Sequence, residues 1–331
     1  MRAPEFWQRD GLWPRLIEPA GWALAGAGAL RRRLVQPARA PLPVVCVGNL
    51  VAGGTGKTPV ALALATLLAR RGRRVCCLTR GYGGTLAGPL AVDPGIHDAH
   101  AVGDEALLLA AAAPTVVARD RVAGAALARA RGADVVVMDD GFQNPGLAKD
   151  LSLIVVDGAV GFGNGRLMPA GPLREPIDTG LARADAVVIV GPDRTRVAGR
   201  VAGAAPILAA RLQPDPGWDV LVGRRVVAFA GIGRPAKFFD ALAAHGIETI
   251  AAVGFPDHHP YRVDELARLE AQAHAADAVL VTTAKDAVRL TAAVRARLTV
   301  LGVTVAWDDP TALDRLLAPV LAAPPDRDRG R

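Results

Sequence analysis

The sequence predicts an α/β protein, with a mostly parallel sheet covered by helices and a second, smaller α/β unit after it. From residue 43 onward, short β-rich runs alternate with Ala- and Leu-rich segments of helical length, which is the pattern of strand–helix–strand crossovers. The same alternation resumes beyond a Gly- and Pro-rich loop at 161–176. Two units of this kind predict a cleft between them, where ligands commonly bind.

Each predicted element has a local reason. The apolar run PVVCVGNL at 43–50 predicts a buried strand, and the Ala/Leu-rich segment 58–71, closed by Gly72, predicts a helix. The same patterns predict strands at 73–81, 115–120 and 133–141, and helices at about 103–113 and 121–131. In the second half they predict strands at 150–158, 185–191, 225–231, 247–253 and 278–283, and helices near 235–245, 263–275 and 310–322.

The charge balance favours an anionic partner. The 331 residues carry a formal net charge of +7, and such a balance suits nucleic acid, a membrane surface or a phosphorylated substrate. Only four of the 39 basic residues are lysines, so genome composition is an alternative source of the charge. We find no recognisable nucleic-acid recognition motif.

The N-terminal region 1–30 predicts a helix lying at a membrane surface. Its apolar stretch PAGWALAGAGAL at 19–30 is too short to span a bilayer, and the arginines follow it rather than precede it, which argues against a signal peptide. Aromatic and basic residues surround the stretch, as in interfacial helices: Phe6, Trp7, Trp13, Trp22, Arg31, Arg32 and Arg33. The alternative is a helix packed on the protein's own core.

The stretch VAGGTGKTPV at 51–60 predicts a phosphate-binding loop (P-loop). A strand, a glycine-rich turn and a helix opening with Lys-Thr give the expected context, although Val51 replaces the usual first glycine. Position 51 opens the loop, so valine is tolerated if its φ stays negative. We expect backbone N–H groups to hold phosphate oxygens, Lys57 to reach the phosphates and Thr58 to ligate Mg²⁺. The candidate nucleotide-binding residues are Val51, Ala52, Gly53, Gly54, Thr55, Gly56, Lys57 and Thr58.

An acidic pair follows a second predicted strand. Asp139 and Asp140 end the apolar run VVVMDDG, and one acid can hold Mg²⁺ while the other orients it or assists proton movement. Guanine-specific NTPases read the base with an N-K-x-D element. The only similar stretch is TTAKDAV, and its spacing is wrong because Lys285 and Asp286 are adjacent. ATP is therefore favoured over GTP.

Three further polar clusters lie between apolar segments. They are Asp104 and Glu105 in VGDEALLL, Asp257, His258 and His259 in FPDHHPY, and Arg166 and Arg174 in GRLMPAGPLREP. Each cluster also has an ordinary structural explanation: a helix start, a solvated turn and surface charge, respectively.

Taken together, these segments resemble the tetraacyldisaccharide 4'-kinase family, the lipid A pathway enzymes of Gram-negative bacteria. The matching segments are VGNLVAGGTGKTPV, LTRGYGG, VGDEALLLA, VMDDGFQN, GFGNGRLMPAGPLREP, FPDHHPY and TTAKDAVRL, from about residue 44 to 290. An aliphatic or small residue at the first loop position is normal in that family.

The resemblance implies a membrane-associated kinase that moves the γ-phosphate of ATP, with Mg²⁺, to the 4'-hydroxyl of a tetraacylated disaccharide 1-phosphate. It implies a RecA-like P-loop domain at 31–150, to which the segment 303–325 returns, and a smaller α/β domain at 151–302 linked by a short β-ribbon. The expected location is the cytoplasmic face of the inner membrane. We infer no protein partner and no nucleic acid.

The resemblance also assigns roles to residues. Asp104 matches the general base and His258 its partner, with Asp257 and Asp140 in the same catalytic group. Glu105 and Asp139 match acids near Mg²⁺, and Tyr82 and Arg174 match residues lining the cleft. Arg166 or Arg174 would suit the 1-phosphate. These roles agree with phosphoryl transfer, in which a positioned carboxylate accepts the proton of a sugar hydroxyl.

Two other classes remain as alternatives. One is a regulatory ATPase of the ParA/MinD or metallochaperone kind, which favours a second lysine early in the loop or a His/Cys metal cluster; this sequence has Val51 and Ala52 there and no such cluster. The other is a nucleic-acid-binding ATPase, which rests on charge alone.

Overall fold

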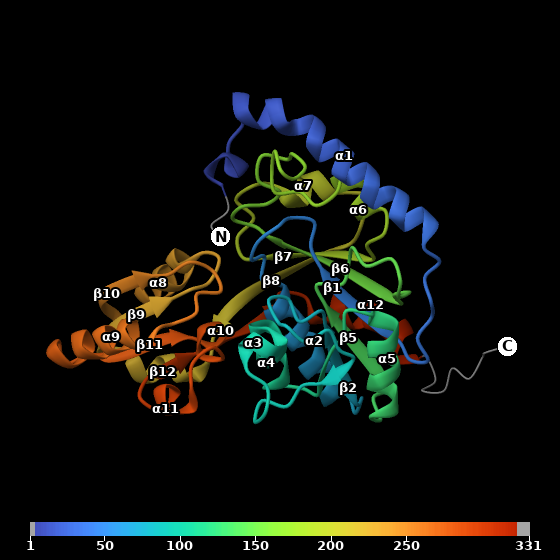
Figure 1. The fold of residues 1–331 in the computed structure, drawn as a ribbon. Coiled ribbons are helices and arrows are strands. Elements are labelled where there is room, and N and C mark those ends of the chain that lie inside the picture. Colours follow the sequence, from blue (N-terminus) through green and yellow to red (C-terminus); the bar gives the residue numbers. More distant parts are fainter. Residues whose placement is uncertain (1–3, 323–331) are drawn as a thin grey trace.

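The computed structural model describes residues 4–322, and within that range the chain forms two sheets (Figure 1). The larger sheet has the strand order β13-β8-β7-β6-β1-β5-β2-β4-β3, and the smaller has the order β10-β9-β11-β12. The strands of the larger sheet are β1 (Val44–Gly48), β2 (Val75–Thr79), β3 (Leu90–Ala91), β4 (Thr115–Val117), β5 (Val135–Asp139), β6 (Leu151–Asp157), β7 (Ala186–Val190), β8 (Ile207–Pro214) and β13 (Val303–Trp307).

The larger sheet is parallel except at its edges. The strands β4, β2, β5, β1, β6, β7 and β8 pair in parallel, whereas β3 and β13 run antiparallel to their neighbours. The central strands are fully buried apolar runs, as expected for a sheet covered on both faces. Because β5, β1 and β6 are adjacent, their carboxyl ends at Asp139, Gly48 and Asp157 meet at one edge. Ligands bind at that edge in open α/β sheets.

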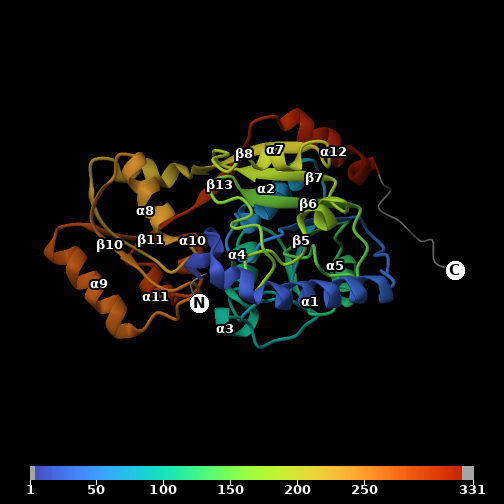
Figure 2. The same cartoon turned by 90° about the horizontal axis from the view of Figure 1, so that it is seen from above.

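Helices cover both faces of the larger sheet (Figures 1 and 2). One face packs against α2 (Lys57–Arg70), α4 (Asp104–Ala110) and α12 (Pro310–Ala322). The other packs against α5 (Arg121–Ala130), α6 (Ile177–Leu181) and α7 (Val197–Val201), while the short α3 (Ala99–Val102) precedes α4. The segment 303–322 thus lies on the larger sheet, and residues 323–325 of the returning segment lie outside the described range.

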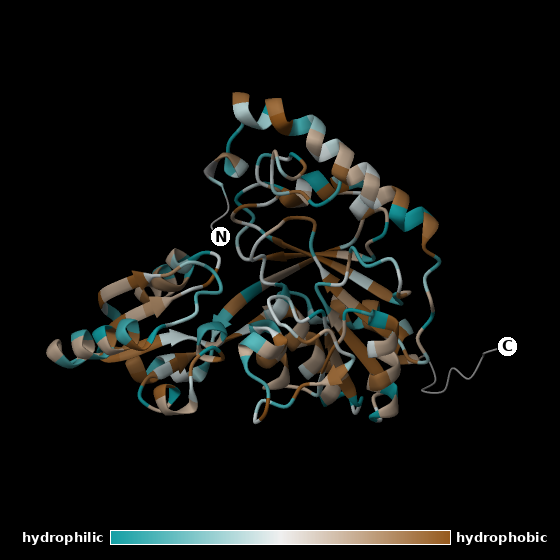
Figure 3. Ribbon diagram, in the orientation of Figure 1, coloured by the Kyte–Doolittle hydropathy of each residue, from teal (hydrophilic) through white to brown (hydrophobic). Residues whose placement is uncertain are grey.

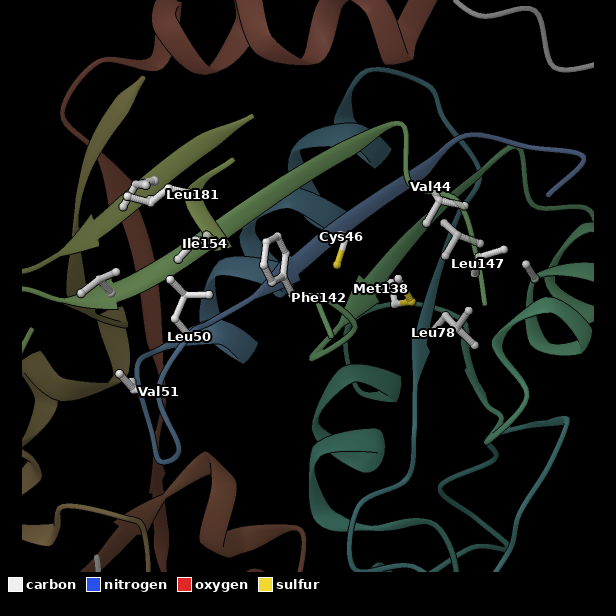
Figure 4. Packing of buried hydrophobic residues seen from close by; sticks show 14 of the residues in the cluster. Val44, Cys46, Leu50, Val51, Leu78, Met138, Phe142, Leu147, Ile154 and Leu181 are labelled. Atoms are coloured by element: carbon white, nitrogen blue, oxygen red, sulfur yellow. The ribbon is translucent and has the colours of Figure 1, made fainter. Parts of the chain in front are cut away.

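A close contact lies between the core and the edge of the sheet where the carboxyl ends of β5, β1 and β6 meet. Phe142, only 1% exposed, lies among Leu50, Ile154, Cys46 and Met138 on the face shown in Figure 4. A Cβ built on Gly48 would lie 2.4 Å from the Cβ of Phe142. Only glycine therefore lets the loop after β5 pack directly on the end of β1, which fixes the two loops relative to each other.

The smaller sheet contains four parallel strands within the described residues: β9 (Arg225–Ala230), β10 (Glu248–Gly254), β11 (Val279–Thr283) and β12 (Thr299–Leu301). The helix α8 (Pro235–Ala244) packs on one face and α9 (Val263–Ala275) on the other. The short α10 (Ala284–Ala287) and α11 (Ala292–Arg295) follow β11. The chain leaves the larger sheet through β8 and the 3₁₀ helix η2 (Pro216–Leu221), and it returns through β13, which pairs antiparallel with β8.

The expected domain boundary at residue 151 is wrong. The strands β6, β7 and β8 continue the larger sheet from β1, and the smaller sheet begins only with β9 at Arg225. The physical reason is that both sheets are parallel α/β units. Their strands have the same apolar pattern, which does not specify the sheet that a strand joins.

The N-terminal helix α1 (Leu12–Leu34) follows the 3₁₀ helix η1 (Glu5–Gln8) and lies on the outside of the larger domain (Figures 1 and 2), where it packs against the loop that contains Arg166 and Leu167. It is buried only along small residues such as Gly21 and Ala25, and Gly21 packs against Leu167. The helix ribbon alternates between apolar and polar residues in Figure 3, and seven of its large apolar side chains are more than half exposed: Leu12, Trp13, Leu16, Trp22, Leu24, Leu30 and Leu34. In the described range, no helix has both the length and the apolar character needed to cross a bilayer.

Candidate active site

The P-loop connects β1 to α2 at the carboxyl end of β1. Gly53 has φ 115° and Gly56, which precedes α2, has φ 89°, so both occupy conformations that favour glycine. The turn brings Lys57 and Thr58 to the helix N-terminus, where backbone N–H groups and the helix dipole attract phosphate. The strand, turn and helix that the sequence predicts here are all present.

Val51 and Ala52 frame this loop and do not face its centre. Val51 forms an isolated antiparallel bridge with Leu173, and its side chain, 6% exposed, belongs to the core shown in Figure 4. The Ala52 N–H donates to the Pro172 carbonyl at 2.7 Å. Neither residue is among those with positive φ, so valine causes no strain. Both residues thus support the shape of the loop, and their contact with the nucleotide stays a prediction.

Lys57 is held by a polar cluster at the loop. Its Nζ lies 2.7 Å from Asp140 Oδ1 and 3.4 Å from Asn49 Oδ1. Arg174 Nη1 donates to the same Asp140 oxygen at 3.0 Å. Burial would raise the pKa of Asp140, but the charges of Lys57 and Arg174 outweigh it and hold the pKa below its ordinary value. Asp140 is thus an ionised carboxylate that orients both cations.

The pKa of Asp139 is shifted in the opposite direction to that of Asp140. Burial, together with the nearby charge of Glu105, raises its pKa to about 7, although Lys57 partly opposes this. The Thr58 hydroxyl donates to Asp139 Oδ2 at 3.0 Å, whereas the buried Oδ1 has no hydrogen-bond partner among the described residues. A buried carboxylate oxygen without a donor, beside a threonine hydroxyl, is a suitable ligand for a hard cation.

A second cluster joins the larger and the smaller domain. Asp104 begins α4 on the larger domain, and His258 follows β10 on the smaller one. His258 Nδ1 lies 2.9 Å from Asp104 Oδ2, and Arg289 Nε lies 3.3 Å from the same oxygen. Burial would raise the pKa of Asp104, but the His258 hydrogen bond and the charges of Lys285, His258 and Arg289 lower it. Because an ionised carboxylate only accepts, Nδ1 donates in this pair.

The other residues of this cluster lie around the pair. His258 Nε2 is 3.6 Å from Asp257 Oδ2, and the rings of Tyr82 and His258 lie 5.9 Å apart, with Tyr82 66% exposed. His259 instead pairs with Glu265 at 2.8 Å, so the geometry selects His258 as the partner of Asp104. A Cβ built on Gly233, in the loop before α8, would lie 3.5 Å from Asp257 Oδ2 and 3.7 Å from the P-loop nitrogen of Gly54.

Two basic residues of this cluster escaped the sequence analysis. Lys285 Nζ lies 3.6 Å from Asp257 Oδ1 and 3.9 Å from Glu105 Oε1. Arg289, 7% exposed at its side chain, also pairs with Asp286 at 3.1 Å. The available signal was their spacing of four residues after a strand, which places two cations on one side of a helical turn.

Arg166 does not join either cluster. Its guanidinium pairs with Asp10 at 3.0 Å and with Glu18, both in the N-terminal segment. The expectation that Arg166 contacts substrate phosphate in the cleft is therefore corrected, because two carboxylates already neutralise it and tie the loop to α1. Of the two arginines, only Arg174 lies at the P-loop, where it pairs with Asp140.

The P-loop, the strand-end acids and the cross-cleft carboxylate–imidazole pair define a P-loop phosphotransferase of the ATP-dependent class. A family model described as tetraacyldisaccharide-1-P 4'-kinase matches residues 13–322. A tetraacyldisaccharide 4'-kinase of Rhodospirillum centenum is 56% identical over 334 residues, or 98% of each chain. One of Gluconacetobacter diazotrophicus is 55% identical, covering 96% of this chain and 97% of that relative.

A solved structure agrees with these relatives. The crystal structure of Aquifex aeolicus LpxK in complex with ATP matches with a TM-score of 0.77 at 28% identity, over 93% of this chain and 99% of that one. The chain belongs to the tetraacyldisaccharide 4'-kinase family. It is an ATP-binding kinase that phosphorylates the lipid A precursor at its 4' position in lipopolysaccharide biosynthesis. The fold class and the family resemblance expected from the sequence are thereby confirmed.

Proposed function

We propose that Asp104 accepts the proton of the substrate's 4'-hydroxyl while the P-loop holds the γ-phosphate of ATP. The observation that carries this assignment is the 2.9 Å contact between Asp104 Oδ2 and His258 Nδ1 across the cleft. Asp104 is 4% exposed, and its lowered pKa keeps it ionised at neutral pH. The adjacent Glu105 influences the pKa of Asp139, so the base lies next to the nucleotide cluster.

The chemistry requires little else from the protein. A sugar hydroxyl is a weak nucleophile, and phosphoryl transfer depends on positioning and charge stabilisation rather than covalent catalysis. His258 orients the Asp104 carboxylate through its Nδ1 proton. Lys57 and the loop N–H groups neutralise charge on the phosphates, and Arg174 keeps Asp140 directed at Lys57. Tyr82, which lies beside His258, is the proposed lining residue for the disaccharide.

The residues present also fit Mg²⁺. The proposed protein ligands are Thr58 and Asp139, with Glu105 nearby, all supplying oxygen atoms. Within residues 4–322 no group of three or more His, Cys, Asp or Glu side chains could hold a metal ion. Mg²⁺ usually binds one or two carboxylates together with substrate phosphates. When bound, the ion would neutralise charge on the β- and γ-phosphates.

The exposed face of α1 supports action at a membrane surface. Seven of its Leu and Trp side chains are more than half exposed, and three arginines occupy its last turn. Such a helix lies with its apolar face in the interface and its basic residues at anionic head groups. We propose the cytoplasmic face of the inner membrane, where ATP is available and the acyl chains of the 1-phosphorylated disaccharide can remain in the bilayer.

The base assignment is tested with Asp104→Asn. Labelled ATP and tetraacyldisaccharide 1-phosphate in nonionic micelles should give a bis-phosphorylated product, and we expect the variant to lower kcat by about 10²- to 10⁴-fold. Asp98→Asn is the matched control, because Asp98 is an exposed residue that caps the neighbouring α3 and asparagine caps equally well. Near wild-type turnover of Asp104→Asn at saturating ATP and lipid would refute the base assignment.

A further inference from the structure

One arginine in the last turn of α1 points into the protein. Arg31 and Arg33 are exposed, whereas the Arg32 side chain is 18% exposed. Arg32 Nη2 lies 3.5 Å from Glu175 Oε2. Of these three neighbouring arginines, Arg32 therefore points inward to a specific buried carboxylate, while the other two are available to solvent.

Glu175 is buried and paired on both of its oxygens. Its side chain is 1% exposed, and Oε2 contacts Arg183 as well as Arg32. Oε1 accepts from Gln143 Nε2 at 3.2 Å. A buried carboxylate needs such partners, because an unpaired charge inside a protein is very costly. The position of Glu175 is consequently set by the three groups that surround it.

Gln143 continues the contacts toward the nucleotide site. Its Nε2 also donates to the Asn49 carbonyl at 2.8 Å, directly before the P-loop. Its Oε1 accepts from Arg174 Nη1 at 3.4 Å, and the same Nη1 donates to Asp140 Oδ1 at 3.0 Å. Asp140 Oδ1 in turn lies 2.7 Å from Lys57 Nζ. A continuous series of ion pairs and hydrogen bonds thus connects α1 to the P-loop lysine.

We propose that Arg32 is a positioning residue for phosphoryl transfer. By pairing with Glu175 it fixes the acceptor that orients the Gln143 amide. That amide presents its oxygen to Arg174, which holds the Asp140 carboxylate against Lys57. The seating of α1 on the protein is therefore coupled to the geometry of the phosphate-binding lysine. The proposal rests on the proposed role of Lys57 and Asp140 at the phosphates.

Arg32 has no other evident reason to be buried in this way. An interfacial helix needs its cations at the head groups, which Arg31 and Arg33 can supply from their exposed positions. Arg183 already gives Glu175 one cation, so neutralisation alone does not require a second. The second cation limits the freedom of a carboxylate whose other oxygen holds Gln143. Contiguous contacts are only suggestive of coupling, and a double-variant comparison is the direct evidence.

The test compares purified full-length variants in nonionic micelles that carry tetraacyldisaccharide 1-phosphate. We expect Arg32→Gln to lower kcat about 3- to 10-fold, with a smaller change in KM for the lipid, because positioning at the phosphates affects the chemical step. Arg32→Lys, which keeps the cation, should recover most of this loss. Arg39→Gln is the activity control, since Arg39 is an exposed residue beyond α1.

A double variant separates positioning from a general effect on stability. If Arg32 acts through Arg174, then Arg32→Gln combined with Arg174→Gln should lower kcat no further than Arg174→Gln alone, within about twofold. Fully multiplicative losses would overturn the proposal, as would an unchanged kcat for Arg32→Gln. Either result would leave the kinase assignment intact. The assignment of Asp104 as the base is tested separately, and it fails if Asp104→Asn keeps full turnover.

Discussion

Replacing Asp139 by asparagine should stabilise the metal-free protein at alkaline pH while it abolishes efficient catalysis. The pKa of Asp139 rises from its ordinary 3.8 to about 7 in the folded protein, so folding penalises the ionised carboxylate. Each pKa unit corresponds to about 1.36 kcal/mol, and the difference therefore amounts to about 4 kcal/mol at most. This cost is absent below the unfolded-state pKa, grows between about pH 4 and 7, and is complete above pH 7.

Asparagine removes that cost with a small structural change. Its amide oxygen can still accept from the Thr58 hydroxyl, as Asp139 Oδ2 does at 3.0 Å. Its NH₂ group would replace Oδ1, which has no hydrogen-bond partner among residues 4–322, and the new donor offsets part of the gain. The loss of attraction to Lys57 offsets another part. We therefore expect a net stabilisation of about 2 kcal/mol at pH 8 and almost none at pH 4.

The assay is urea denaturation in the presence of a chelator at pH 4 and at pH 8. The neighbouring Asp140→Asn is the matched control of opposite sign. The pKa of Asp140 is lowered despite its burial, because Lys57 and Arg174 stabilise the carboxylate, so it contributes stability above its unfolded-state pKa and the variant should lose stability at pH 8. An Asp139→Asn protein that is no more stable than wild type at pH 8, or whose gain is independent of pH, would refute the reasoning.

Three further predictions concern the membrane face, the domain contact and the core. Trp13→Glu combined with Trp22→Glu should reduce flotation with anionic vesicles and leave the melting temperature nearly unchanged, because both side chains are more than half exposed. Asp157→Asn should raise KM for ATP and lower the melting temperature, since the buried carboxylate pairs with Arg234 and with Lys237 of the smaller domain; an unchanged KM for ATP would show that this contact between the domains does not support the nucleotide site. Gly48→Ala should cost about 1–3 kcal/mol in urea denaturation, because its methyl group would overlap Phe142.

The sequence predicted the nucleotide half of the site because its determinants are local. A strand, a glycine-rich turn and a helix opening with Lys57 and Thr58 occupy consecutive residues, and each has a recognisable pattern. Asp139 follows from the same logic, since the acid ends a fully buried strand next to β1. The family resemblance then supplied Asp104 and His258, which lie 154 residues apart and meet only in the folded chain.

The residues that the sequence misplaced depend on long-range packing. Arg166 occurs in the same loop as Arg174, yet only the latter reaches the P-loop cluster, because the N-terminal segment supplies Asp10 and Glu18 to the former. Arg289 meets its partner Asp104 only through the contact between the two domains. No local pattern distinguishes Arg166 from Arg174 or identifies Asp104 as the partner of Arg289.

The adjacent and chemically identical side chains of Asp139 and Asp140 occupy different environments. Asp139 is the last residue of β5, with its side chain enclosed under the loop beside Glu105, so its carboxylate is poorly solvated and suited to a cation. Asp140 turns away with φ 52° and meets Lys57 and Arg174. The two environments move the pKa values of the two carboxyl groups in opposite directions. Identical side chains can therefore serve different functions. The backbone turn between them therefore directs Asp140 to Lys57 and leaves Asp139 as the proposed metal ligand.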